Sequence, residues 1–417
     1  MKYLKNIFII PYIIISLIIL SGCNSGQINK NTYVKGRDFQ FMYFRQGSSP
    51  IMAEADNGYY FFSGCYLYYA DKKTMKPVIL CNKPNCLHDN EKNGKKIINC
   101  NAFFYNYSFP FISYYDDNIY VVSGKVGKAE EYELTKITSD GTKRETILEF
   151  DVKPMSVAIH RGKVYYTQTA YDKNQKSVYC IKEFELGGFN KKPREIYTGT
   201  LEGGHIQDLM CYGNNLYFTE FAQSQKAFKS ITMRYDLLTK EARKLFLDIN
   251  ENDMEISTFP AVYNGKLYYS VSKYNVDGTA QEINSFTCDL DGKNRKKIFN
   301  IDKDSMFLSD LKYLYSNDFR WSADAKPKEQ QKFRVLDKDG KVMNSFKTGN
   351  INDYSNILCG GDSHLFITSG NDNKYQIFYT DKSKFGFGNI ELKTFFEIDK
   401  NRMTPTVMTD SDTIIEN

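Results

Sequence analysis

One sequence unit recurs along almost the whole chain, and this repeat limits the possible folds more than any other feature. Each copy has a turn pair such as Asn-Gly, then one or two apolar residues, then a tyrosine or phenylalanine. The seven aromatic markers are Tyr60, Tyr120, Tyr165, Tyr217, Tyr268, Tyr315 and Phe366. They are separated by 60, 45, 52, 51, 47 and 51 residues, although the sixth copy lacks its turn pair. A period of this length indicates a repeat architecture.

The fifth copy shows what one repeat contains. Residues 260–263 and 266–272 predict two strands joined by an Asn-Gly turn, which suits positive φ. Residues 283–290 and 296–299 predict two more strands, joined by an Asp-Gly turn. Four strands with tight turns in each repeat are typical of propeller blades, whereas a pair of β-sandwiches does not explain the sustained period. We therefore predict an all-β fold, a β-propeller of four-stranded antiparallel blades, with seven blades favoured over six or eight.

The repeat resembles that of Tol-B-like and related propellers, which occur in many exported bacterial proteins. The resemblance rests on the repeat pattern alone, covers most of the chain and implies a fold without an activity. A propeller ring must close, and we predict that residues 39–45 form a strand that pairs with the last blade near residues 392–398. Residues 400–417 show no clear pattern and are predicted to be a C-terminal tail.

The N-terminus has the pattern of an export signal. Lys2 and Lys5 precede an apolar run over residues 7–20, which is too short to favour a helix that spans a bilayer. The residues that follow, Leu20-Ser21-Gly22-Cys23, resemble the bacterial lipobox. The resemblance implies cleavage before Cys23 and attachment of lipid to its thiol. An uncleaved anchor helix is the alternative.

These features divide the chain into four parts. We predict a lipoprotein signal peptide at residues 1–22, a flexible polar tether at 23–37, the propeller at 38–399 and the tail at 400–417. The predicted location is the extracytoplasmic face of the cell membrane, with the membrane as a partner through lipid on Cys23. Cleavage leaves 417 − 22 = 395 residues and, with the loss of two lysines, changes the formal charge from +5 to +3. That charge is too small to indicate a nucleic-acid partner.

The longest interval between markers contains an insertion, residues 81–100, that is rich in potential metal ligands. Cys81, Cys86, His88 and Cys100 are spaced C-x4-C-x-H-x11-C, and Cys65 lies in a predicted turn of the same blade that should approach the insertion. Three thiolates and an imidazole suit a tetrahedral structural zinc ion, which would hold a loop that has no core of its own.

Disulfides are the competing prediction for these cysteines, because an exported protein meets an oxidising environment. One possible set of disulfides joins Cys86 to Cys100 and Cys65 to Cys81, but connectivity does not follow from sequence. Unpaired thiols are a third alternative. The insertion resembles a Cys-rich connection in uncharacterised propeller lipoproteins of Gram-positive anaerobes. That resemblance implies no activity.

The sequence offers no recognisable catalytic constellation. His160 is predicted to be a packing residue of the repeat. His205 is expected in a polar loop and His364 in a turn, and neither has an acidic pair or a nucleophile beside it in sequence. Neither a nucleophile elbow nor a P-loop occurs. Trp321, in a polar excursion, is a candidate for contact with a protein or glycan ligand. The remaining cysteines are expected to be buried in strands: Cys180, Cys211, Cys288 and Cys359.

The leading hypothesis is therefore a non-enzymatic, membrane-anchored module that binds a ligand or a protein. An exported hydrolase or lyase acting on glycan is the alternative, and an accessory lipoprotein of a membrane complex or sensor is a third. The fold alone does not choose between them, because propellers have many functions.

Overall fold

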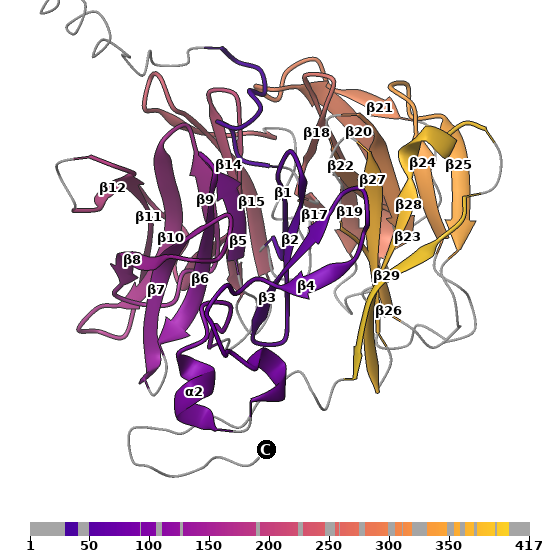
Figure 1. Ribbon diagram of the computed structural model, residues 1–417. Helices are drawn as coiled ribbons and strands as arrows, with labels where there is room; N and C mark the ends of the chain where they lie inside the picture. The colour runs from indigo at the N-terminus through magenta and orange to yellow at the C-terminus, as the bar shows by residue number, and fades with distance from the viewer. Residues whose placement is uncertain are drawn as a thin grey trace, which may run out of the picture.

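The computed structural model describes residues 30–40, 50–91, 93–105, 111–125, 128–188, 192–223, 228–246, 255–257, 259–274, 280–298, 305–310, 312–318, 332–347, 354–358, 363–370, 373–387 and 390–399. Over these residues the chain forms seven antiparallel sheets, arranged as the blades of a β-propeller (Figure 1). The predicted fold and the preferred blade count are confirmed. Over the same ranges, no helix is both long and apolar enough to cross a membrane.

Each blade uses strands that are consecutive in sequence, the first innermost and the last outermost. The first two blades contain β1 (Met52–Glu54), β2 (Gly58–Ser63), β3 (Tyr66–Asp71), β4 (Pro77–Ile79), β5 (Phe111–Tyr115), β6 (Asn118–Lys125), β7 (Lys128–Thr138) and β8 (Arg144–Phe150). The next two contain β9 (Val157–His160), β10 (Lys163–Tyr171), β11 (Ser177–Glu185), β12 (Arg194–Thr198), β13 (Gly204–Tyr212), β14 (Asn215–Gln223), β15 (Phe228–Asp236) and β16 (Ala242–Lys244).

The fifth blade differs in its innermost strand, which is divided into two pieces that both pair with β19. Its strands are β17 (Glu255–Ser257), β18 (Ala261–Tyr263), β19 (Lys266–Tyr274), β20 (Ala280–Asp289) and β21 (Lys296–Ile298). The last two blades contain β22 (Ser305–Ser309), β23 (Leu314–Asp318), β24 (Lys332–Leu336), β25 (Val342–Lys347), β26 (Tyr354–Leu358), β27 (His364–Gly370), β28 (Lys374–Asp381) and β29 (Lys393–Asp399). The helical turns are η1 (His88–Asn90), α2 (Gly94–Ile98) and η3 (Lys382–Lys384).

The repeated turn pairs and aromatic markers have separate structural roles. In the fifth copy Asn264 and Gly265 adopt φ values of 49° and 68°, the left-handed conformation that a two-residue hairpin turn requires. Three marker tyrosines donate a hydrogen bond to the turn between the third and fourth strands of the next blade. These bonds are Tyr60 to the Ser139 carbonyl (3.0 Å), Tyr217 to the Leu290 carbonyl (2.9 Å) and Tyr268 to the Lys338 carbonyl (2.9 Å).

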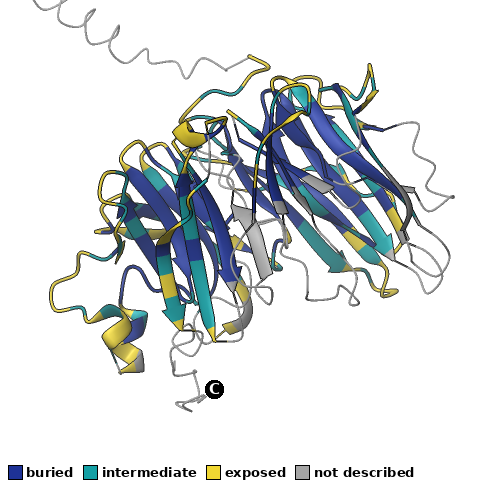
Figure 2. Ribbon diagram, turned by 90° about the vertical axis from the view of Figure 1, so that its right-hand side faces the viewer, coloured by how far each residue is buried: buried dark blue, intermediate teal, exposed yellow. Residues whose placement is uncertain are grey.

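The core lies between the blades, where their inner strands are buried on both faces (Figure 2). Aromatic side chains fill much of this space, and pairs such as Phe150 and Tyr166 pack edge to face across a blade boundary, with ring centroids 5.0 Å apart. Such contacts add to the stabilisation that burial itself gives. The density of tyrosine and phenylalanine in the sequence therefore reflects inter-blade packing.

The first and last blades meet through side chains. Tyr59 packs against Phe366 at 4.7 Å between ring centroids, and its hydroxyl lies 2.9 Å from His364 Nδ1. Phe61 packs against Phe395 at 5.2 Å. We call this contact between blades 1 and 7 the seam.

The segment predicted to close the ring by strand pairing lies mostly outside the described residues, at positions 41–45. Its described part, Phe39 and Gln40, lies elsewhere: Phe39 stacks on Phe111 of β5, and the Gln40 side chain bonds the backbone of Glu54 at the end of β1. Among the described strands, β29 pairs with β28 alone. The described residues thus give no strand exchange at the seam.

The two faces of the ring differ in what covers them (Figure 1). The turns between the first and second strands, at Asn57, Asp117, Arg161 and Asn214, form what we call the first-turn face. Residues 30–40 lie on it, including residues 30–37 of the predicted flexible tether, whereas positions 23–29 are outside the described residues. The insertion with α2 lies on the opposite face, here called the loop face.

Candidate metal centre and ligand pocket

The insertion begins where β4 ends and returns the chain toward the inner strand of the second blade, as its position in the repeat predicted. It contains little regular structure of its own: η1 has three residues and α2 has five. The Asn93 side chain caps α2 by accepting a hydrogen bond from the Lys96 N–H at 3.3 Å. Helices this short are not stable alone. The insertion therefore depends on contacts with the blades and between its own side chains.

Four side chains of the insertion converge. The ligand atoms of Cys81, Cys86, His88 and Cys100 all lie within 4.8 Å of one another. Cys100 Sγ is 3.6 Å from His88 Nδ1. With zinc–sulfur and zinc–nitrogen bonds of about 2.3 and 2.0 Å, a tetrahedral site separates such a pair by about 3.5 Å. The four groups therefore fit the geometry of a zinc site.

Hydrogen bonds from the backbone support thiolate character in this cluster. Burial opposes ionisation of Cys81, but the N–H groups of Lys83 and Asn101 bond its sulfur, and the balance lowers the pKa of this thiol. Burial raises the pKa of Cys100, which is 2% exposed, and the Ala102 N–H offsets this effect in part. A buried thiolate needs a nearby positive charge, and a bound cation supplies one.

The cluster is attached to the first two blades. Ala102 accepts a hydrogen bond from the Leu67 N–H of β3 at 2.9 Å, and Tyr66 donates from its hydroxyl to the His88 carbonyl at 3.0 Å. On the second blade, Arg144 donates to the Phe103 carbonyl at 2.6 Å and lies 4.1 Å from the centre of the Phe104 ring. The four ligands therefore connect the end of blade 1 to the start of blade 2.

Cys65 is not a member of this group, although the sequence analysis placed it among five candidates. It lies in the two-residue turn between β2 and β3, where Gly64 has a φ of 59°. Its carbonyl accepts a hydrogen bond from the Phe104 N–H at 2.8 Å, so its backbone does contact the end of the insertion. Cys81, Cys86 and Cys100 are free thiols.

The other predicted site residues fall outside this cluster. Cys180, Cys211 and Cys288 are buried, as expected for strand residues. Cys359, Trp321 and Cys23 lie outside the described residues. His160 is fully buried, as predicted, but it contacts the N-terminal segment: its Nδ1 accepts from the Phe39 N–H at 3.1 Å.

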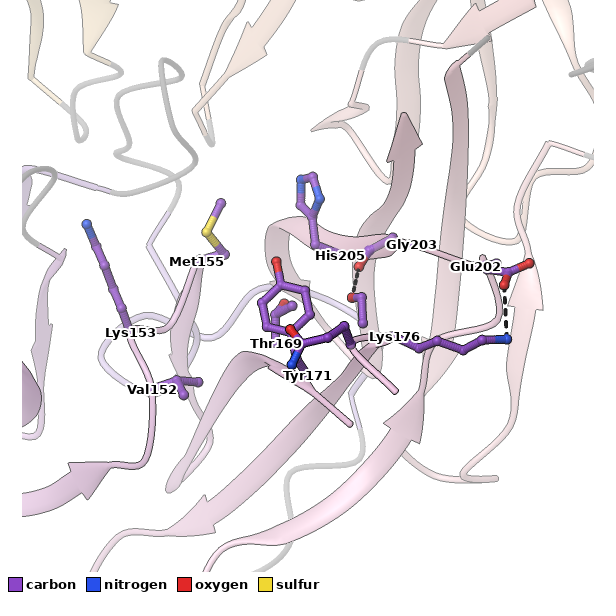
Figure 3. A pocket seen from close by; sticks show the side chains of 12 residues that line it. Val152, Lys153, Met155, Thr169, Tyr171, Lys176, Glu202, Gly203 and His205 are labelled. Atoms are coloured by element: carbon purple, nitrogen blue, oxygen red, sulfur yellow. Dashed lines mark hydrogen bonds and ion pairs between the residues drawn. The ribbon is translucent and has the colours of Figure 1, made fainter. Parts of the chain in front are cut away.

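A second feature of the loop face is a cavity of about 650 Å³ between blades 3 and 4 (Figure 3). Three separate loops line it, at residues 152–155, 171–177 and 202–205. Tyr171 lies at this cavity with 70% of its surface exposed. The sequence did not predict this pocket, because its lining comes from three separate connections whose residues carry no common motif.

Polar groups lie on several parts of the pocket wall. Lys176 and Glu202 form an exposed ion pair of 3.2 Å at one side, and Ser177 donates to the Gly204 carbonyl at 2.6 Å (Figure 3). The Thr169 hydroxyl is buried in the wall and has no hydrogen-bond partner among the described groups. Burial lowers the pKa of the Lys153 amine. The pocket therefore offers donors, acceptors and an exposed aromatic ring.

A buried carboxylate holds one wall of the pocket in place. Glu220 is fully buried, and it accepts hydrogen bonds from the Tyr179 hydroxyl at 2.8 Å and from the Thr200 N–H at 2.9 Å. The Tyr197 hydroxyl also donates to it. These bonds fix the loop that leads to Glu202 and His205. The wall is thus preorganised by groups that do not themselves line the pocket.

No protein-family model matches the sequence, and no curated protein matches it either. Solved structures do show the same fold. The tricorn protease is 11% identical, with a TM-score of 0.50, over 87% of this chain and 36% of that one. Prolyl oligopeptidase B from Galerina marginata is 11% identical, with a TM-score of 0.52, over 89% of this chain and 52% of that one.

A third structure, the β-propeller domain of the Trilobed protease from Pyrococcus furiosus, is 14% identical with a TM-score of 0.45, over 69% and 84% of the two chains. This chain thus spans about a third of the tricorn protease and about half of the oligopeptidase. At these identities the likeness concerns architecture and not activity. The chain thus shares a β-propeller architecture with the tricorn protease and the oligopeptidase.

Proposed function

We propose that this chain is a membrane-anchored, extracytoplasmic β-propeller that binds a ligand or a protein without enzymatic activity. The observation that carries this proposal is the pocket on the loop face, which is built from three loops and backed by the buried Glu220 network. Ligand sites in propellers and other scaffolds commonly combine an apolar lining with a few placed polar groups. The lipobox-like residues before Cys23 support the anchor and the location.

Binding is favoured over glycan hydrolysis by the chemistry of the pocket lining. Hydrolysis of a glycosidic bond generally requires two carboxyl groups on opposite sides of the bond. Among the described residues that line this pocket, Glu202 is the single carboxylate, and it is paired with Lys176. The exposed Tyr171 ring suits stacking on a sugar or an aromatic side chain.

The binding test uses soluble peptidoglycan fragments, which contain both sugar and peptide, followed by a glycan array. We expect saturable binding that Tyr171→Ala weakens at least tenfold, because stacking is lost. Val178→Ala is the matched control, since Val178 is exposed on a neighbouring strand outside the pocket. Equal binding by the wild type and by Tyr171→Ala would show that this pocket is not the binding site. Release of cleaved fragments would favour the alternative, a glycan-active enzyme.

The second part of the proposal is a structural zinc ion held by Cys81, Cys86, His88 and Cys100. Four protein ligands fill a tetrahedral shell and leave no open position, which is typical of structural and not of catalytic zinc. Bound zinc would stabilise the insertion by joining its two ends. Native mass spectrometry should detect one zinc per chain, lost with chelator and absent from Cys100→Ser. A gain of two hydrogens per cysteine pair on reduction would instead establish disulfides.

A further inference from the structure

Arg161 is the centre of a set of contacts that hold residues 30–40 on the first-turn face. Its guanidinium donates two hydrogen bonds to the Asp38 carboxylate, from Nε at 2.7 Å and from Nη2 at 3.1 Å. Nη2 also donates to the carbonyls of Lys30 and Thr32, at 2.7 and 3.1 Å. Paired charged hydrogen bonds of this kind combine strength with a defined geometry. Arg161 therefore fixes both ends of the segment.

The fourth blade provides a second attachment. Asn31 Oδ1 accepts hydrogen bonds from the Asn214 N–H at 3.0 Å and from Asn215 Nδ2 at 2.9 Å. The backbone of Gly213 approaches so closely that a Cβ there would lie 2.6 Å from Asn31 Oδ1. The segment is thus fitted to the turn between β13 and β14.

Burial shows that the segment belongs to the folded domain. Asp38 and Phe39 are each 4% exposed, and His160, which accepts from the Phe39 N–H, is 0% exposed. A buried carboxylate is tolerated only when it is paired, and Arg161 pairs with it. Residues 30–40 are therefore a docked strap, and we use this name for them below.

We propose that the strap orients the propeller on the membrane, with the first-turn face toward the lipid and the loop face away from it. This inference rests on the proposed anchor at Cys23. Six residues lie between Cys23 and Lys30, so these two positions are at most about 25 Å apart. Without docking, the 28 residues between Cys23 and Met52 of β1 would span up to about 100 Å and impose no orientation.

The covalent anchor, and not surface charge, sets this orientation. Charges of both signs lie together on the first-turn face, as in the exposed ion pair of 2.9 Å between Lys35 and Asp56. Asp116 and Asp117 add negative charge nearby. A mixed face has no strong attraction to anionic lipid. The same orientation is therefore expected on neutral and on anionic membranes.

The test is energy transfer from a fluorescent side chain to acceptor lipids, with the full lipidated protein in phosphatidylcholine vesicles. The label is introduced either at Asn57 on the first-turn face or at Lys173 in the turn between β10 and β11; both positions are exposed. The nine residues of β10 correspond to about 30 Å between the faces. We expect transfer at least twofold higher from position 57 than from position 173, with and without added phosphatidylserine.

Variants separate the role of the strap from that of the fold. Arg161→Ala should bring the two transfer values to within about 20% of each other, and Asn31→Ala, which alters only the strap, should reduce their ratio by less. Arg243→Ala, in an exposed ion pair with Glu241, is the control and should keep the twofold ratio.

Vesicle flotation distinguishes the two levels of the proposal. A chain that does not float with vesicles would overturn both the anchor and the orientation. A chain that floats but shows equal transfer from positions 57 and 173 would overturn the orientation alone. Retention of the twofold ratio by a folded Arg161→Ala variant would show that the strap does not set it.

Discussion

His160 is a buried imidazole whose two ring nitrogens have different partners. Nδ1 accepts from the Phe39 N–H, and Nε2 lies 2.8 Å from the Gly213 carbonyl, which requires the N–H on Nε2. This arrangement exists only for the neutral ring. Burial lowers the pKa of His160 to about 4, although Asp38 opposes the shift. Docking of the strap thus depends on the protonation state of one residue.

The first prediction follows from this lowered pKa. In the unfolded chain the imidazole has a pKa of about 6.5, so the unfolded state takes up the proton first as pH falls. Stability should be greatest above pH 6.5 and should decline toward pH 4, by up to about 3 kcal/mol from this group. Urea unfolding at pH 7.5, 6, 5 and 4.5 measures the decline.

His160→Gln should show a smaller decline over the same range, because the titrating group is absent. His205→Gln, on the loop face, is the control: its free energy of unfolding should fall with pH as steeply as that of the wild type. An equally steep profile in His160→Gln would mean that other groups cause the acid sensitivity.

At the scale of strands and turns, three marker tyrosines, Tyr60, Tyr217 and Tyr268, connect their blade to the next through a hydrogen bond. Tyr217→Phe removes the hydroxyl that bonds the Leu290 carbonyl and leaves that acceptor without this donor. We expect a loss of about 1–2 kcal/mol in the free energy of unfolding, measured in urea. Tyr171→Phe should change stability by less than about 0.5 kcal/mol, because Tyr171 is largely exposed.

The insertion leads to a prediction about metal removal. Because α2 and η1 are too short to persist alone, loss of zinc should unfold the insertion locally. Zinc at a thousand times its dissociation constant stabilises a protein by about 4 kcal/mol, so chelation should lower the melting temperature and increase amide exchange in residues 81–104. Chelator should have no further effect on Cys100→Ser. A wild-type melting temperature that chelator leaves unchanged would contradict this prediction.

The whole ring has one boundary that differs from the others, since the seam joins the first blade to the last. Phe395 of β29 reaches Phe61 across it, and Phe150 of β8 occupies a similar outer-strand position at the boundary of blades 2 and 3. Phe395→Ala and Phe150→Ala should each lower the free energy of unfolding by about 3–5 kcal/mol. Only Phe395→Ala should increase amide exchange in both blade 1 and blade 7. If amide exchange in blades 1 and 7 rose equally in the two variants, the seam would be no less stable than the other blade boundaries.

The architecture was predictable because turn residues and aromatic markers recur where the fold needs them. The sixth copy lacks its turn pair, and here Asp310 replaces it by accepting hydrogen bonds from the N–H groups of Lys312 and Tyr313, both at 2.7 Å. The sixth copy could therefore still be recognised by the spacing of its aromatic marker, although its turn pair is absent. The ligand spacing likewise identified the Cys/His cluster, but the sequence did not separate Cys65 from it.

The strap and the pocket were not predictable from periodicity. Residues 30–37 are polar and have no apolar pattern, so they indicated a tether. Lys30 and Asn31 are held by groups more than 100 positions away, through the bonds from Arg161 to the Lys30 carbonyl and from the Asn214 N–H to the Asn31 side chain. One local signal was present: Arg161 occupies a turn position with a φ of 50°, where the fifth copy has Asn264. An arginine in a left-handed turn is uncommon and marks a side chain that is held by other contacts.

The strap also determines how tension on the N-terminus would pass through the molecule. A pull along the chain from the proposed lipid anchor would reach Lys30 and Asn31 first, and their bonds would transfer the load to Arg161 and Asn214 in the middle of the sequence. The seam, where described side chains of blades 1 and 7 pack together, lies beyond this point of attachment. Mechanical load on the anchor would therefore be borne by blades 3 and 4 and would not peel β1 from the ring.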